Sequence, residues 1–132
     1  MMHHSHRVRS YEVDHQGYLF NGRYLEIADA AMAEFFRFLG FGYNRLIELG
    51  FDPAVVASDL RFSSPGKLDD DLQIAVDMEH LGTSSIRLRL DFSHDNEPIA
   101  VILTTYVNVD TKTNASHPIP ELIRAALSAL PG

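Results

Sequence analysis

One short segment of the chain, residues 13–24, brings an acidic side chain, a glycine and the start of a helix close together. Asp14 ends an alternating, strand-like stretch, Gly17 follows three residues later, and Asn21 and Gly22 stand directly before a long helical pattern. The first N–H groups of a helix lack partners inside it and carry the positive end of its dipole, so they stabilise a developing oxyanion. A carboxylate beside them can attack a carbonyl or activate a water molecule. The spacing therefore predicts chemistry at a carbonyl group.

The same residues also have a purely structural interpretation. An aspartate that precedes a glycine often bonds the backbone of its own turn, and Asn21 suits the N-cap position of a helix. His15 adjoins Asp14, but neighbouring residues of an extended loop usually point apart, so we do not expect these two side chains to form an acid–base pair.

Hydrophobic periodicity predicts the elements that position this loop. A helix over residues 22–39 is apolar on most of its circumference, with its charged residues gathered on one side, and Gly40 is the glycine expected after its end. A shorter helix is predicted over residues 43–49 and a terminal one over 120–130.

Alternation of apolar and polar residues predicts the strands. They cover residues 7–13, 55–63, 72–79, 85–92 and 99–109, of which 72–79 and 85–92 form a hairpin. Residues 99–109 are apolar on both faces, which is typical of a central strand covered on both sides. One antiparallel sheet wrapped around the long helix is the economical way to bury these surfaces, so the fold class is α+β.

Composition limits the function further. The chain has 132 residues and no cysteine, which predicts one domain over residues 1–132 and excludes disulfide scaffolds, thiol nucleophiles and cysteine-based metal sites. A net charge of −7 argues against nucleic acid or an anionic membrane as the main partner. The histidines lack metal-ligand spacing, so we expect no metal.

The beginning of the chain shows no apolar signal segment, and no stretch is long and apolar enough to span a membrane. We therefore expect a cytoplasmic protein. Residues 1–6 include His3, His4 and His6, and a polar start of this kind predicts a disordered N-terminus.

The loop sequence resembles the signature of hotdog-fold thioesterases, in the group of 4-hydroxybenzoyl-CoA thioesterase and the Tol-Pal-associated acyl-CoA thioesterases. In Asp14-x-x-Gly17, asparagine follows the aspartate by seven residues and tyrosine by ten. Further similar stretches, in the order of the family, are Leu39-Gly40-Phe41, Asp59-Leu60-Arg61-Phe62 with Ser64-Pro65, Gly82-Thr83-Ser84 and Pro118-Ile119-Pro120-Glu121-Leu122. The resemblance thus covers nearly the whole chain.

This resemblance implies a hotdog fold, an antiparallel sheet of five or six strands around the central helix, and an acyl-CoA thioesterase without a cofactor. Asp14 would be the nucleophile or general base, and the backbone N–H groups of Asn21 and Gly22 would bind the thioester oxygen. Substrate-binding residues would be Gly17, Tyr18, Tyr24, Ser63 and Ser64, and Arg61 and Lys67 are added as candidates from this chain itself. The family also forms dimers, often paired into tetramers, with the active site at the dimer interface, so we expect self-association.

The chain departs from the family at the hairpin turn near Gly82, where relatives often carry basic residues that hold the phosphates of coenzyme A. Residues 80–85 offer only His80. Arg61, Lys67, Arg87 and Arg89 are the available substitutes, although arginines that alternate along a strand usually solvate its outer face.

Two other functions remain open. A non-catalytic protein that binds acyl thioesters would keep the fold and the aspartate. A hotdog dehydratase or hydratase would need a catalytic histidine near the helix entry, where residues 18–20 are Tyr-Leu-Phe and only His15 is available.

Overall fold

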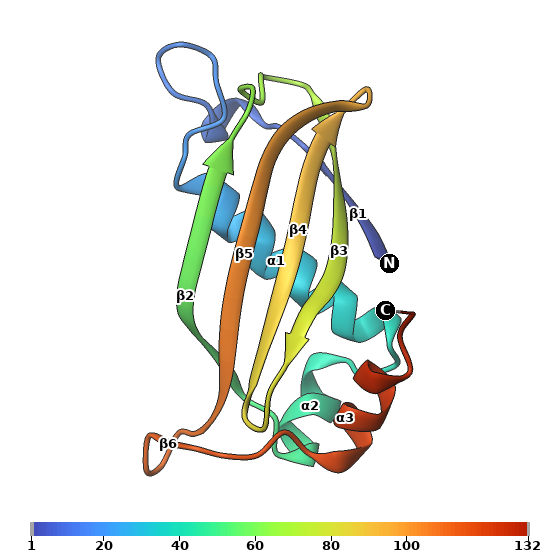
Figure 1. The fold of residues 1–132 in the computed structure, drawn as a ribbon. Helices are drawn as coiled ribbons and strands as arrows, with labels where there is room; N and C mark the ends of the chain where they lie inside the picture. The colour runs from blue at the N-terminus through green and yellow to red at the C-terminus, as the bar shows by residue number, and fades with distance from the viewer. Residues whose placement is uncertain (1, 132) are drawn as a thin grey trace.

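The computed structural model describes residues 2–131 and consists of a curled antiparallel sheet, a long helix against one of its faces, and two shorter helices (Figure 1). The strands are β1 (Met2–Arg7), β2 (Pro53–Phe62), β3 (Asp71–Leu81), β4 (Ser85–His94), β5 (Glu97–Asp110) and β6 (Ala115–Ser116). The helices are α1 (Arg23–Phe38), α2 (Tyr43–Leu49) and α3 (Glu121–Ser128), and a 3₁₀ turn, Ser10–Glu12, precedes α1.

The strand order across the sheet is β1-β3-β4-β5-β2, and the short β6 pairs with the end of β5. Strands β3, β4 and β5 form successive hairpins, which confirms the predicted hairpin and its central neighbour. The two outermost strands, β1 and β2, flank α1 in the sequence. The loop that follows β1 leads directly into the start of α1, and this start lies beside the end of β2.

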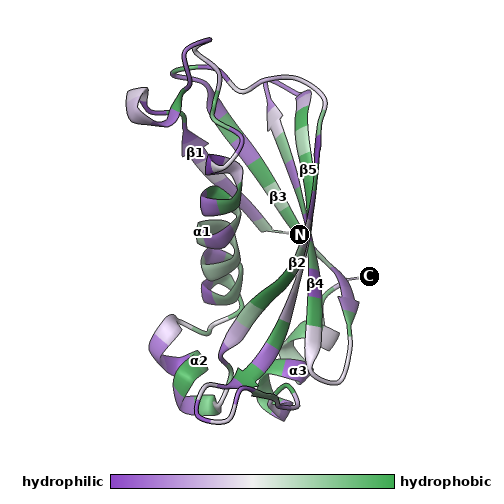
Figure 2. Ribbon diagram, turned by 90° about the vertical axis from the view of Figure 1, so that its left-hand side faces the viewer, coloured by the Kyte–Doolittle hydropathy of each residue, from purple (hydrophilic) through white to green (hydrophobic). Residues whose placement is uncertain are grey.

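The core lies between α1 and the sheet. The buried positions of α1 recur at helical spacing and are Tyr24, Ile27, Ala28, Ala31, Phe35 and Phe36. They face strands whose buried and exposed side chains alternate, seen as alternating green and purple bands in Figure 2. Burial of each of the larger apolar side chains among them, Ile27, Phe35 and Phe36, contributes roughly 1.5–3 kcal/mol to stability. The predicted helix over 22–39 is confirmed to within a residue at each end.

Two apolar surfaces are left uncovered in the part of the chain that the structure describes. Strand β2 pairs only with β5, and Val55, Val56 and Phe62 on it are 56%, 58% and 52% exposed. The face of the sheet turned toward the viewer in Figure 1 carries no helix over its central strands, because α2 and α3 lie at one end. On β5 this face holds half-buried Val101 and Leu103.

The N-terminus differs from the prediction. Residues 2–7 are not disordered but form β1, which pairs with β3 from Met2 opposite Val76 to Arg7 opposite Asp71; Met1 lies outside the described residues. The strand predicted over 7–13 is therefore wrong, since the chain turns at Ser10–Glu12. Backbone pairing stabilises an edge strand whatever its side chains are, so the polar sequence concealed β1.

Together these elements make a hotdog fold, a sheet curled around one long helix. Among the described helices, none is long and apolar enough to cross a membrane.

Candidate active site

The loop between β1 and α1 is a small hairpin closed by backbone hydrogen bonds. The N–H of Asp14 donates to the carbonyl of Tyr18 (2.8 Å), and the N–H of Phe20 donates to the carbonyl of Glu12 (2.9 Å). Gly17 at the tip has φ +77°, a conformation that strains residues with a side chain. The presence of glycine at this position is therefore explained by the turn itself.

The Asp14 carboxylate is half-buried and directed by its own turn. Its Oδ1 accepts the N–H of Gln16 (2.9 Å) and the N–H of Tyr18 (3.2 Å). This is the structural arrangement that the aspartate–glycine spacing also predicted. No hydrogen bond within residues 2–131 involves Oδ2, so one carboxylate oxygen is left for chemistry.

The start of α1 presents two unpaired amides. The N–H groups of Arg23 and Tyr24 donate to the carbonyls of Phe20 and Asn21. Among the hydrogen bonds of residues 2–131, none is donated by the N–H of Asn21 or Gly22. Gly22 is the N-cap residue and no side chain caps the helix, so the expected capping role of the Asn21 side chain is wrong. What α1 offers at this point is a pair of free donors at its positive end.

A pocket of about 450 Å³ opens beside these amides, between the start of α1 and the end of β2. It brings together five of the predicted site residues: Tyr18, Asn21, Tyr24, Ser63 and Ser64. The other lining residues are Leu19, Phe62 and Pro65. Asp14, Gly17, Gly22, Arg61 and Lys67 do not line this pocket.

Tyr24 forms a wall of the pocket and fastens the loop opposite it. Its ring lies 5.1 Å from that of Phe62 and 5.5 Å from that of Phe92, and its hydroxyl accepts the N–H of Gly66 (3.3 Å). Burial raises the pKa of the Tyr24 phenol, which keeps it neutral. Tyr24 therefore forms part of the pocket wall and holds the loop at Gly66 in place.

The two serines differ in their hydroxyl groups. Both backbone N–H groups donate to the carbonyl of Ile99 (2.8 Å from Ser63, 3.2 Å from Ser64). The Ser64 hydroxyl donates to Glu97 Oε1 (3.0 Å), whereas no hydrogen bond among the described residues involves the Ser63 hydroxyl. Ser63 is thus the serine whose hydroxyl can face a ligand.

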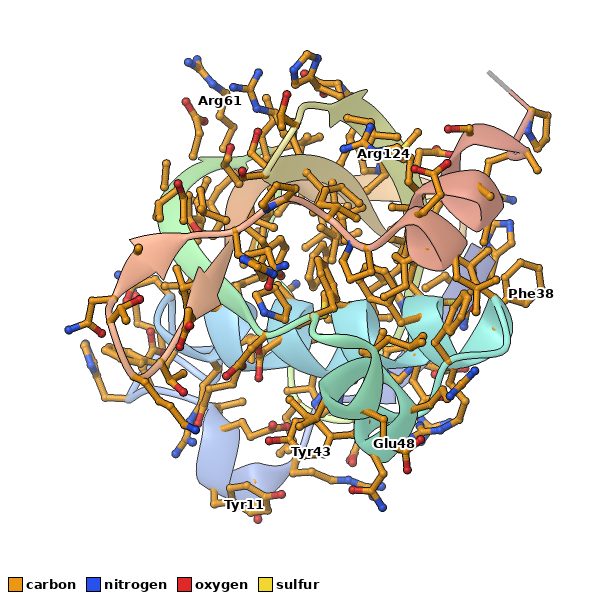
Figure 3. The ribbon with its side chains drawn as sticks, turned by 90° about the horizontal axis from the view of Figure 1, so that it is seen from below. Tyr11, Phe38, Tyr43, Glu48, Arg61 and Arg124 are labelled. Atoms are coloured by element: carbon orange, nitrogen blue, oxygen red, sulfur yellow. The ribbon has the colours of Figure 1, made fainter. Side chains whose placement is uncertain are left out.

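The two predicted basic residues lie in different places. Arg61 is 82% exposed and bonds Asp59 (3.1 Å), and Figure 3 shows its side chain on the side of the sheet away from α1. Lys67 lies on the loop next to the pocket, where it forms an isolated bridge with Tyr18. The structure therefore places Lys67 beside Tyr18 of the pocket, whereas the Arg61 side chain points away from α1.

Sequence reasoning missed three residues that line the pocket, Leu19, Phe62 and Pro65, and also Glu97, which bonds Ser64. Phe62 belongs to the Asp59-Leu60-Arg61-Phe62 stretch that carried the resemblance, and its place three residues before Pro65 could have indicated a pocket wall. Glu97, the partner of Ser64, gave no signal, because the two residues meet only through the pairing of β2 with β5.

His15 is exposed and makes no hydrogen bond within the described residues. No group of three or more metal-binding side chains occurs in residues 2–131.

The chain is similar in sequence and fold to known thioesterases and to a protein named as an esterase. Residues 8–127 match the family described as the thioesterase-like superfamily. A curated protein of Aquifex aeolicus (strain VF5), named "Putative esterase", is 26% identical over 123 residues, covering 92% of this chain and 93% of that protein.

Two solved structures with named activities share the fold. Gentisyl-coenzyme A thioesterase BH1999 is 25% identical with a TM-score of 0.87, covering 96% of this chain and 99% of the other. Slr0204, a 1,4-dihydroxy-2-naphthoyl-CoA thioesterase from Synechocystis, is 16% identical with a TM-score of 0.86, covering 97% and 96%. At 16% identity the likeness shows a common fold.

Proposed function

Because the chain belongs to the thioesterase-like superfamily, we propose that it is an acyl-CoA thioesterase whose chemistry takes place at the loop before α1. The observation that supports this most is the pair of free N–H groups on Asn21 and Gly22, which lie beside a pocket and seven residues after a carboxylate with one unbonded oxygen. The names of the two related thioesterases support the same class of substrate.

In this proposal the thioester carbonyl oxygen rests on the amides of Asn21 and Gly22, which stabilise the oxyanion as it forms. Asp14 either attacks the carbonyl carbon itself or removes a proton from a water molecule that attacks it. In both routes the C–S bond breaks, the coenzyme leaves as a thiol after protonation, and water supplies the new oxygen of the free acid. No cofactor takes part.

The position of Asp14 outside the pocket of one chain is accounted for by self-association. Strand β2 is ten residues long and unpaired along one edge among the described residues, and it carries exposed Val55, Val56 and Phe62. An edge of this kind is a template for pairing with a second copy. We propose a homodimer through β2, in which the second copy completes the acyl-binding site beside Asp14 and the Asn21 and Gly22 amides of the first. Lys67, close to the pocket, is the proposed contact for a phosphate of coenzyme A.

The experiment that tests the activity is release of free thiol from a panel of acyl-CoA thioesters. The panel includes acetyl-, octanoyl-, palmitoyl-, benzoyl-, gentisyl- and 1,4-dihydroxy-2-naphthoyl-CoA. We expect saturable hydrolysis of at least one member. No thiol release from any of them would contradict the proposal.

A second function is favoured by one observation: Asp14 Oδ1 already bonds two N–H groups of its own turn. In this alternative the aspartate only shapes the loop, and the protein binds acyl thioesters without cleaving them. Calorimetric titration with the same panel distinguishes the two, since tight binding without thiol release would establish the binder. For the dehydratase alternative, exposed His15 is the only histidine near the helix entry, and the structure gives it no partner within residues 2–131.

The oligomer is tested separately. Val56→Arg places a charge on the exposed edge of β2, and we expect the dimer to dissociate in size-exclusion chromatography with loss of thiol release. Arg61→Ala, on the same strand but with a side chain pointing away from α1, is the control and should leave the dimer intact. A monomeric wild-type protein with full activity would refute the dimer.

A further inference from the structure

Glu12 is a buried carboxylate that the proposed chemistry does not use. The residue is only 7% exposed, and the two other buried polar residues of the described chain, Thr104 and Asn108, are uncharged. A buried charge is tolerated only when it is well bonded. Oε1 of Glu12 accepts the N–H of Arg9 (2.7 Å), and its two oxygens lie 2.9 and 3.1 Å from Nε2 of His6.

These contacts fasten the loop to the sheet. His6 belongs to β1 and lies opposite Leu72, a fully buried residue of β3. The bond between His6 and Glu12 therefore joins the sheet edge to the residue where the hairpin loop begins. The bond to the N–H of Arg9 closes the 3₁₀ turn between β1 and Glu12.

The backbone of Glu12 extends this connection to the proposed oxyanion site. Its carbonyl accepts the N–H of Phe20, and the carbonyl of Phe20 in turn accepts the N–H of Arg23 at the start of α1 (both 2.9 Å). Asp14 lies between these anchored points, and Asn21 directly follows Phe20. Glu12 is thus bonded to both arms of the loop that carries the carboxylate and leads to the free amides.

We infer that Glu12, held by His6, is a positioning residue that sets the distance between Asp14 and the amides of Asn21 and Gly22. The inference rests on the proposed thioesterase activity. A displacement of about 1 Å in such a constellation costs roughly 10²-fold in rate. The effect falls on kcat, because the acyl-binding pocket is lined by other residues.

The test compares Glu12→Ala with Glu12→Gln on the best substrate of the acyl-CoA panel. The alanine variant loses both carboxylate contacts, and we expect kcat to fall about 10- to 100-fold while KM changes by less than about threefold. An amide oxygen can accept the Arg9 N–H and an amide N–H can donate to an imidazole nitrogen. The glutamine variant should therefore recover most of the lost kcat. His6→Ala should lower kcat in the same direction.

Loss of stability alone is controlled with Ile123→Ala. Ile123 is fully buried on α3, at the end of the sheet away from the loop (Figure 1), so this variant lowers Tm without touching the site. Its kcat per folded molecule should equal that of the wild type. An unchanged kcat in Glu12→Ala, a loss shared by Ile123→Ala, or no recovery in Glu12→Gln would overturn the inference while the wild type stays active. If the wild-type protein hydrolyses no member of the acyl-CoA panel, the proposed function is refuted, and the inference is refuted with it.

Discussion

The two ends of the sheet are built differently. One end, called the hairpin end here, contains the turn between β3 and β4 at residues 82–84. Arg124 donates hydrogen bonds to the carbonyls of Gly82 (2.6 Å) and Thr83 (2.9 Å), and the Thr83 carbonyl also accepts the N–H of Ile119. At the loop end, around residues 13–22 and 63–68, two amides at the start of α1 are left without partners and Phe20 is 52% exposed. The free amides of α1 adjoin a pocket, whereas the bonds of the 82–84 turn fasten α3 to the sheet, so the loop end is the region that can bind and react and the other end stabilises the protein.

The largest expected effect tests whether the loop end carries the chemistry. Asp14→Asn keeps an oxygen that can accept the N–H groups of Gln16 and Tyr18, but it removes the charge needed for attack or proton transfer. We expect kcat for acyl-CoA hydrolysis to fall by about 10²-fold or more.

Asp110→Asn provides the matched control at the other end. Asp110 Oδ1 accepts the N–H of Lys112 (2.9 Å) in a similar turn, far from the pocket. Thiol release should be unchanged in this variant. If thiol release fell equally in the two variants, or did not fall in Asp14→Asn, the loop end would not be the place of the chemistry.

The second prediction concerns the stability of the hairpin end. Asn108 is 1% exposed, donates to the carbonyls of Gly50 (3.0 Å) and Pro118 (3.2 Å), and accepts the N–H of Asp52 (2.8 Å). Asn108→Ala leaves these groups unsatisfied and should lower the free energy of unfolding by about 2–3 kcal/mol. Urea denaturation measures the loss, and kcat of the folded fraction should stay at the wild-type value. A fall in kcat would mean that the two ends are coupled.

Two glycines, one at each end of the sheet, allow the same comparison with a smaller expected loss of stability. Gly17 at the loop end and Gly50 at the hairpin end both have positive φ, +77° and +89°, with open space where a Cβ would lie. Alanine at either position should cost about 1–2 kcal/mol and lower Tm by several degrees. Only Gly17→Ala should also reduce thiol release, because it distorts the turn that directs Asp14. Equal activity in both variants would show that the turn does not need this conformation.

The smallest effect is a pH dependence at the loop end. A hydrogen bond to the carbonyl of Asp71, supported by nearby Asp70 and Asp95, raises the pKa of His94 above its ordinary value of 6.5. A raised pKa in the folded state stabilises the fold at low pH, and this contribution disappears as the pH rises through the folded pKa. The difference in Tm between wild type and His94→Gln should therefore be larger at pH 5.5 than at pH 8. A difference that grows with pH would contradict this sign.

The sequence by itself determined the main elements of the fold. Alternation predicted the β3–β4 hairpin, a run of residues apolar on both faces predicted β5, and helical periodicity predicted α1 and α2, with Gly40 after the end of α1. These predictions succeeded because burial on one face imposes a period that no other arrangement shares. The spacing from Asp14 to Asn21 also located the loop whose carboxylate oxygen and amides are left unbonded.

Tertiary structure decided the rest. The polar segment Met2–Arg7 became a strand because β3 offered it an unpaired edge, and Glu12 left the predicted strand because its carboxylate is bonded by Arg9 and His6. The pocket depends on contacts such as that of Tyr24 with Phe62, residues far apart in the chain. Periodicity reports which face of an element is buried, but contacts between distant segments depend on how the sheet curls. This is why the sequence alone did not show that Lys67 pairs with Tyr18 beside the pocket while the Arg61 side chain points away from α1.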